Sequence, residues 1–179
     1  MTTNNPRIAI LGAGVSGICM AIKLKEAGFT NLVIYEKADR VGGTWRENTY
    51  PGVSCDVPTH LYSFSFAQKF DWPKLYSGGA EIQAYLEDVS EKSGIIPLCQ
   101  FHSEITGATY QNDEWIVSIT DASGNNKQEK FDYVISSLGG LHSPAYPNIP
   151  GLEDFRGASF HTAKWDHNVD LTGKKVAII

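Results

Sequence analysis

Cysteine is scarce in this sequence, and the few cysteines present show no pairing pattern. Cys19, Cys55 and Cys99 are the three cysteines among 179 residues, and none belongs to a CxxC pair or to a Cys/His cluster with the spacing of metal ligands. An odd, widely spaced set excludes a disulfide framework and gives no support for a metal site. We therefore expect free thiols in a reducing compartment, no metal, and a cytoplasmic protein.

Positive charge is also in short supply. Lys and Arg number 15 against 20 Asp and Glu, which gives a formal net charge of -5 at pH 7. A chain of this kind has no broad basic surface with which to neutralise phosphates or anionic lipid head groups. Nucleic acid is therefore not an expected partner.

Long hydrophobic runs are missing as well. The uncharged stretch 8–22 follows Arg7, but glycines and a serine interrupt it, and Lys23, Lys25 and Glu26 follow without a small-residue cleavage site. It is also too short to cross a bilayer, which takes about 20 apolar residues. We expect neither a signal peptide nor a membrane span.

The chain begins with the pattern of a strand, a helix and a second strand. Residues 7–11 (RIAIL) form a short apolar run that ends in glycines, as a buried parallel strand does. Residues 16–26 predict a helix that ends at Gly28, and residues 32–36 (LVIYE) predict a second buried strand. Together these segments make a βαβ unit.

The middle of the chain changes character twice. Residues 37–79 are rich in Gly, Pro, Ser, Thr and aromatics without a sustained period, and because a loop of this length is usually functional, we expect it to face a ligand. Residues 80–92 then follow a helical period and end before Gly94. The next segments are strand-like and separated by turn residues, which predicts an antiparallel meander: 100–105, 108–110, 115–120 and 128–131.

The last part of the chain contains one more strand and a proline-rich connector. Residues 133–136 (YVIS) predict a buried strand, and Pro144, Pro147 and Pro150 mark an extended connector. Residues 174–179 (KKVAII) repeat the composition of the first strand; a lone strand cannot bury itself, so we expect it to pair with a neighbour or stay disordered. The whole pattern is α/β and predicts a Rossmann-like domain with a parallel core sheet and an antiparallel β-meander.

A glycine motif lies where the first strand meets the first helix. Gly12, Gly14 and Gly17 spell GxGxxG, in which the first glycine permits the tight turn, the second lets backbone approach a pyrophosphate and the third lets helix pack close to strand. The helix N-terminus offers unpaired N–H groups to the phosphates. Glu36 ends the second strand, where a carboxylate accepts hydrogen bonds from ribose hydroxyls and repels a 2′-phosphate, which favours FAD or NAD over NADP. The alternative is a glycine turn used only for packing, with Glu36 on a solvated surface.

Two further stretches resemble a known family. Residues 36–62 (EKADRVGGTWRENTYPGVSCDVPTHLY) resemble the flavin-binding stretch of class B flavoprotein monooxygenases, in the flavin-containing monooxygenase superfamily. A second motif, FxGxxxHxxxW(P/D), is similar to the signature of type I Baeyer-Villiger monooxygenases and is formed by Phe155, Gly157, His161, Trp165 and Asp166. The resemblance covers nearly the whole chain and identifies it with an N-terminal FAD-binding part. It implies an FAD-binding domain with its linker over residues 1–168, and the first strand of a truncated NADP-binding domain over residues 169–179.

The resemblance implies a role for each matching residue. Residues 12–17 would hold the pyrophosphate of FAD, Ile105 would meet the adenine through its backbone, and Gly139 would let the last core strand pass close to the cofactor. Asp56 would be the catalytic carboxylate beside the flavin, buried and paired with an arginine from a segment that this sequence does not contain. The expected cofactor-binding residues are Gly12, Ala13, Gly14, Val15, Ser16, Gly17, Glu36, Lys37, Gly43, Thr44, Trp45, Arg46, Asp56, Tyr62, Ile105 and Gly139.

Several of these residues also have a simpler interpretation. Trp45 and Tyr62 could pack a loop, and Asp56 could be a turn residue next to Pro58. Arg46 carries a charge in a loop, where charged side chains are usually solvated. His161 is expected to be a hydrogen-bonded structural histidine of the linker and not an acid or base.

The activity that the resemblance implies is that of an FAD- and NADPH-dependent monooxygenase. Such an enzyme inserts one oxygen atom of O2 into a ketone to give an ester or lactone, or oxidises a sulfide or an amine. These 179 residues contain one GxGxxG and no evident NADPH site, so we expect FAD binding with little turnover. The alternatives are a non-catalytic dinucleotide-binding flavoprotein module and an NAD-dependent reductase, and the lack of a catalytic Tyr/Lys or metal constellation disfavours the reductase.

Overall fold

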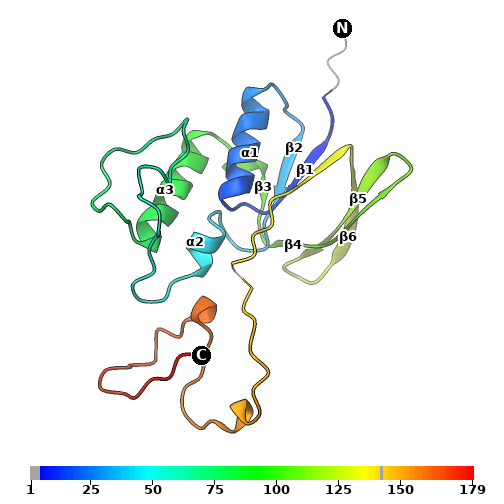
Figure 1. The fold of residues 1–179 in the computed structure, drawn as a ribbon. Coiled ribbons are helices and arrows are strands. Elements are labelled where there is room, and N and C mark those ends of the chain that lie inside the picture. Colours follow the sequence, from blue (N-terminus) through cyan, green and yellow to red (C-terminus); the bar gives the residue numbers. More distant parts are fainter. Residues whose placement is uncertain (1–4, 142) are drawn as a thin grey trace.

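Strand β1 (Ile8–Leu11) is buried on both faces, and this determines how the layers are arranged. Ile10 packs among residues of the helices, whereas Ala9 and Leu11 pack against a second sheet, because successive side chains of a strand point to opposite faces. The computed structural model, which describes residues 5–141 and 143–179, shows the helices, a parallel sheet and an antiparallel sheet as successive layers (Figure 1).

The parallel sheet has the order β3-β2-β1-β7. Its other strands are β2 (Leu32–Tyr35), β3 (Cys99–Gln100) and β7 (Tyr133–Ser136). Ile10 of β1 lies opposite Ile34 of β2 and Ile135 of β7. This confirms the predicted parallel core, in which β1 is flanked on both sides.

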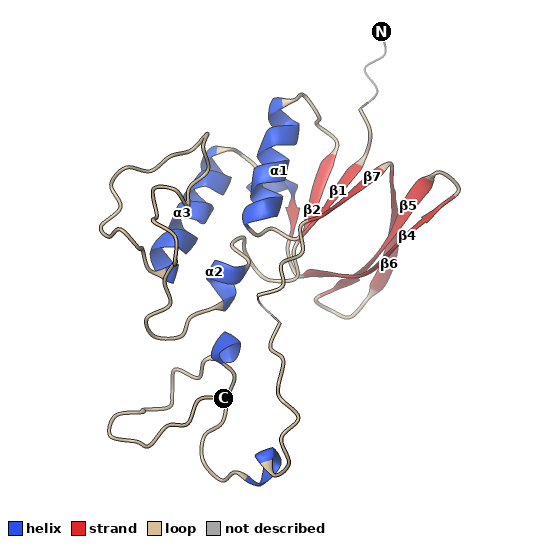
Figure 2. Cartoon of the chain, in the orientation of Figure 1, coloured by secondary structure: helices blue, strands red, loops and turns tan. Residues whose placement is uncertain are grey.

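Two helices cover one face of this sheet (Figure 2). Helix α1 (Val15–Glu26) buries Ile18 and Ile22, and helix α3 (Gly79–Lys92) buries Ile82 and Leu86 in the same cluster. A third helix, α2 (Thr44–Glu47), lies within the segment that we expected to be a loop. It is a single turn, which is too short to show a helical period in the sequence.

The antiparallel sheet covers the other face. It consists of β4 (Ser103–Gln111), β5 (Glu114–Asp121) and β6 (Asn126–Phe131) in that order. Asn112 and Asp113 both have positive φ, 52° and 61°, as a tight hairpin between twisted strands requires. The predicted meander is therefore confirmed, and it packs on the parallel sheet through a cluster formed by Ala9, Leu11, Tyr35, Val117, Ile119 and Phe131.

The boundaries of the meander differ from the prediction. Residues 100–105 do not form one strand, because His102 adopts a left-handed conformation with φ 53° that separates the two sheets. Gln100 thus belongs to β3 of the parallel sheet, and the meander starts at Ser103. The remainder of that piece, residues 103–105, and the piece expected over 108–110 belong to one strand, β4, which has a register shift between Ile105 and Gly107.

The linker after β7 has little regular structure. It contains two short 3-10 helices, η2 (Leu152–Asp154) and η3 (Thr162–Lys164); another, η1 (Ile96–Leu98), precedes β3. The strand expected over 174–179 does not form: the segment is hydrogen-bonded into neither sheet, and Val176, Ile178 and Ile179 are exposed. Throughout residues 5–141 and 143–179, no helix is long and apolar enough to cross a membrane.

Candidate functional site

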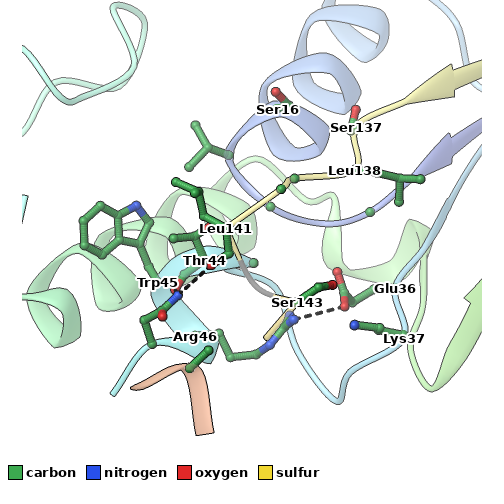
Figure 3. Close-up of a pocket in the computed structure, with 18 of the residues that line it drawn as sticks. Ser16, Glu36, Lys37, Thr44, Trp45, Arg46, Ser137, Leu138, Leu141 and Ser143 are labelled. Atoms are coloured by element: carbon green, nitrogen blue, oxygen red, sulfur yellow. Dashed lines mark hydrogen bonds and ion pairs between the residues drawn. The ribbon is translucent and has the colours of Figure 1, made fainter. Parts of the chain in front are cut away.

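A cavity of about 1010 Å³ opens at the carboxyl ends of the parallel strands (Figure 3). The chain leaves β1 toward α1 on one side and reaches β7 on the other, so the crevice lies where the strand order reverses. Open parallel sheets bind ligands at this point. All the predicted cofactor-binding residues line the cavity except Ala13 and Gly17.

Two glycines of the first turn, Gly12 and Gly17, are in close contact with backbone atoms. Gly12 has φ +100°, and a β carbon there would lie 3.0 Å from the carbonyl oxygen of Ser137. At position 17 a β carbon would lie 1.9 Å from the carbonyl oxygen of Gly12, so helix α1 packs directly on the turn. At both positions a side chain would collide with backbone atoms of the protein, so the fold itself requires glycine there.

At position 14, neither the backbone φ nor the packing of the protein requires a glycine. Its φ is -81°, and a β carbon there would meet only the α carbon of Gly43 at 3.6 Å, an ordinary contact. What the missing side chain leaves is bare backbone on the cavity wall. No side chain caps the N-terminus of α1, and Val15 and Ser16 of its first turn line the same wall. Free N–H groups and the positive end of the helix dipole suit a pyrophosphate.

A second glycine turn, at Gly42 and Gly43, packs against the first. The N–H of Gly42 donates to the carbonyl oxygen of Ala13 at 2.9 Å, and a β carbon at Gly43 would lie 3.0 Å from the α carbon of Gly14. Gln83 of α3 supports this turn from behind, because its Nε2 donates to the carbonyl oxygen of Val41 at 2.8 Å. The two turns are thereby joined into one wall.

Glu36 is buried at the end of β2, with 5% of its surface exposed. Its Oε2 accepts a hydrogen bond from the N–H of Ala13 at 2.9 Å, and its Oε1 accepts one from the N–H of Ala38 at 3.0 Å. The carboxylate is thus tied to the glycine turn and lines the cavity. The solvated surface position considered as an alternative is wrong.

Arg46 is also buried, which contradicts the expectation of a solvated loop charge. Its Nη2 lies 3.2 Å from Oε1 of Glu36 and 2.7 Å from Oε1 of Glu47, and its Nη1 donates to the carbonyl oxygen of Arg40 at 2.5 Å. Figure 3 shows the pair with Glu36 as a dashed line across the floor of the site. The reason is that α2 turns Arg46, its one basic residue, inward, toward a carboxylate ten residues earlier in the sequence.

Aromatic side chains occupy the other end of the cavity. The indole Nε1 of Trp45 donates to the hydroxyl oxygen of Tyr62 at 3.1 Å, and the two rings meet edge to face with centroids 5.6 Å apart. Both residues are half-buried and line the cavity. They pack against each other, as expected if they pack the loop, and both line the cavity together with Thr44.

Asp56 does not have the buried environment that the resemblance implied. It lines the cavity but is exposed, in a bend that follows buried Cys55. The chain bends at Asp56 and Val57, so that Cys55 is buried while the residue that follows it stays exposed. Ile105 of β4 and Gly139, beyond β7, lie on the remaining walls of the cavity.

Some cavity residues were not predicted from the sequence. Ser137 and Leu138 directly follow β7, and Ser103 and Glu104 begin β4. The first pair could have been found, because residues just after a parallel strand line the carboxyl edge of the sheet. The second pair depends on the break at His102, for which the sequence gives no local signal.

The linker passes over the cavity and is attached to the region after α2. The Nδ2 of Asn48 donates to the carbonyl oxygen of Leu141 at 3.1 Å, and Thr49 Oγ1 is 3.0 Å from Nε2 of His167. His161 lines the cavity, and its Nδ1 accepts the N–H of Ala163 at 3.0 Å. His161 is therefore hydrogen-bonded within the linker, as expected.

Burial and the charge of Glu36 also act on a neighbouring cysteine. Desolvation, and then the negative charge of Glu36, raise the pKa of the Cys99 thiol to about 12. Its Sγ faces the carbonyl oxygen of Ile95 at 3.6 Å. A thiol with a raised pKa is a poor nucleophile at neutral pH, so Cys99 adds no reactive group to the site.

Comparisons with known proteins agree with this geometry. Residues 10–77 match a family described as NAD(P)-binding Rossmann-like domain. A Baeyer-Villiger monooxygenase of Streptomyces coelicolor is 44% identical over 173 residues, which make up 97% of this chain and 33% of that protein. An FAD-binding monooxygenase of Aspergillus niger is 38% identical over 181 residues, covering 96% of this chain and 30% of that protein.

Solved structures give the same result. An oxidized steroid monooxygenase bound to NADP matches with a TM-score of 0.78 and 31% identity, over 94% of this chain and 33% of that one. The chain thus spans about a third of the length of the relatives it matches. The Rossmann-like α/β fold and the resemblance to Baeyer-Villiger monooxygenases are both confirmed.

Proposed function

We propose that this chain is the FAD-binding part of an NADPH-dependent Baeyer-Villiger monooxygenase. The proposal is supported by similarity along nearly the whole chain to proteins of that name and by the cavity at the edge of the parallel sheet. When bound, FAD supplies the reaction with O2 that inserts one oxygen atom into a ketone, or that oxidises a sulfide or amine. The protein binds and orients the cofactor and excludes water.

The single observation that carries the proposal is the bare backbone at Gly14. Neither the φ of residue 14 nor the protein atoms around it require a glycine, yet this residue lies on the wall of a large cavity. A ligand that packs directly on the backbone explains the glycine, because a side chain there would block its approach. The cavity is at the upper end of the range of ligand pockets, about 300–1,000 Å³. Its polar end has free helix amides and a carboxylate, and its other end has paired aromatics, which fits a dinucleotide with a flat ring at one end.

We assign the residues as follows. The backbone from Gly12 to Ser16 holds the pyrophosphate, and Glu36 accepts hydrogen bonds from the ribose of the adenosine. Trp45 and Tyr62 flank the flavin. Asp56, on the exposed rim, is the proposed catalytic residue and acts through an arginine supplied by another segment, since its carboxylate lies open to a partner.

Domain organisation and location are part of the same proposal. Residues 1–168 form the FAD-binding domain with its linker, and residues 169–179 begin an NADP-binding domain. The cytoplasm is the proposed compartment, because Cys19, Cys55 and Cys99 are all free thiols. The proposed partners are O2 and a small-molecule ketone, sulfide or amine.

Flavin titration tests the proposal. FAD added to the purified chain should acquire a shifted visible spectrum and quench tryptophan fluorescence at a one-to-one stoichiometry, whereas NADP should not compete at equal concentration. A chain that stays colourless in excess FAD, or that prefers NAD to FAD, would contradict the proposal. Addition of NADPH and a ketone should give little turnover, because the sequence holds a single GxGxxG.

A further inference from the structure

Arg46 lies between two carboxylates on the floor of the cavity. Its side chain is 7% exposed and that of Glu36 is 6% exposed, while Glu47 is more open at 30%. Helix α2 carries Arg46 and Glu47, and β2 ends next to Glu36. The guanidinium therefore bridges the helix that presents Thr44 and Trp45 to the strand end beside the glycine turn.

The guanidinium has little capacity left for a ligand. Its Nη1 donates to the carbonyl oxygen of Arg40, and its Nη2 and Nε donate to the carboxylates of Glu36 and Glu47, so every nitrogen of the group is engaged within the protein. A side chain held in this way is poorly placed to contact the flavin. Its effect on a ligand must pass through the groups it holds.

The carboxylate of Glu36 is arranged around this contact. It accepts from Ala13 and Ala38 as well as from Arg46, which accounts for three of its roughly four acceptor positions. A buried carboxylate is costly unless a cation and hydrogen-bond donors compensate its charge. Arg46 supplies that cation and fixes the orientation of the Glu36 carboxylate, with acceptor capacity left toward the cavity.

We propose that Arg46 is a positioning residue for recognition of the ribose hydroxyls: it acts through Glu36 and not by contact with the flavin. This inference rests on the proposed function, because it concerns the adenosine end of the same dinucleotide site. It assigns to Arg46 a role different from the direct cofactor binding that the family resemblance implied.

The experiment compares ADP with 2′,3′-dideoxy-ADP as ligands of the chain, by calorimetric titration. The two ligands differ only in the ribose hydroxyls. In the wild-type chain ADP should bind roughly 10- to 100-fold more tightly, as expected for hydrogen bonds to a charged acceptor. In Arg46→Ala this ratio should fall to about 3-fold or less, and Arg46→Lys should restore part of it because the charge is kept without the planar fork.

Controls separate this role from general loss of structure. Arg40→Ala removes an exposed arginine of the same loop and should keep the wild-type ratio. A purely structural role of Arg46 would weaken both ligands equally and leave the ratio unchanged, which would overturn the inference, as would a wild-type chain that does not distinguish the two ligands. A role at the flavin end would weaken FAD and FMN with an unchanged ADP ratio, and would overturn it too. Wild-type binding of ADP with the expected ratio but no binding of FAD would contradict the proposed function alone.

Discussion

Gly17 lies against the carbonyl group of Gly12: a β carbon at position 17 would be 1.9 Å from that oxygen and 3.0 Å from its carbon. The oxygen belongs to backbone at the start of the glycine turn, so neither partner can move without shifting β1 or α1. The third glycine of the motif is therefore part of the packing of the fold, whereas the second faces the cavity. This difference leads to the first two predictions.

Gly17→Ala should destabilise the fold. The added methyl group forces helix and turn apart, and overpacking of this kind costs about 1–3 kcal/mol. The measurement is the free energy of unfolding in urea. Gly140→Ala is the matched control, since a β carbon there meets nothing within 4 Å and the free energy should be unchanged. Equal stability of the two variants would show that α1 can shift without cost.

Gly14→Ala should separate binding from stability. The site has room for a methyl group, so the loss in the free energy of unfolding should stay below about 1 kcal/mol, the cost of alanine at a helix N-cap. The methyl group would nevertheless block the approach of a pyrophosphate, and the affinity for FAD should fall at least about tenfold, equivalent to 1.4 kcal/mol. Flavin fluorescence titration measures this. Unaltered affinity would mean that the glycine turn does not hold the cofactor.

Alkaline pH should weaken the fold through Cys99. Burial, followed by the charge of Glu36, raises the pKa of this thiol from 9.0 to about 12. A group whose pKa is raised by folding contributes stability below its unfolded pKa and loses it as the pH rises through the folded pKa. The free energy of unfolding should therefore decline between pH 9 and pH 12, and less steeply in Cys99→Ala. Urea unfolding at several pH values tests this, and identical slopes for the two chains would count against it.

Tyr85→Phe should loosen the loop between α2 and α3. The Tyr85 hydroxyl accepts the N–H of Phe64 and donates to the carbonyl oxygen of Ala67, both at 2.8 Å. Its removal leaves two backbone groups without this partner, at a cost of about 1–3 kcal/mol. Urea unfolding and hydrogen exchange at the Phe64 amide measure the effect. Tyr110→Phe alters an exposed tyrosine and should change neither, so a similar loss in both variants would rule out the loop contact as its cause.

Much of the fold could be predicted because its signals are local. The apolar runs of β1 and β2, the helical period over α3 and the turn residues Asn112 and Asp113 each act over a few positions. The glycine spacing likewise located the site. The break at His102 was missed because a single left-handed residue leaves no period, and α2 because one helical turn has none either.

The sequence by itself determined the order of β1, α1, β2, α3 and β7 along the chain, the position of the glycine turn and the carboxylate that follows β2, because spacing and periodicity act between near neighbours along the chain. Only the tertiary structure decided that Arg46 would be buried against Glu36, that Asp56 would face outward and that Gly14 would border open space. These outcomes depend on which segments meet across the carboxyl edge of the sheet. A charged side chain that becomes buried there needs a partner of opposite charge, whereas one at the rim stays in water.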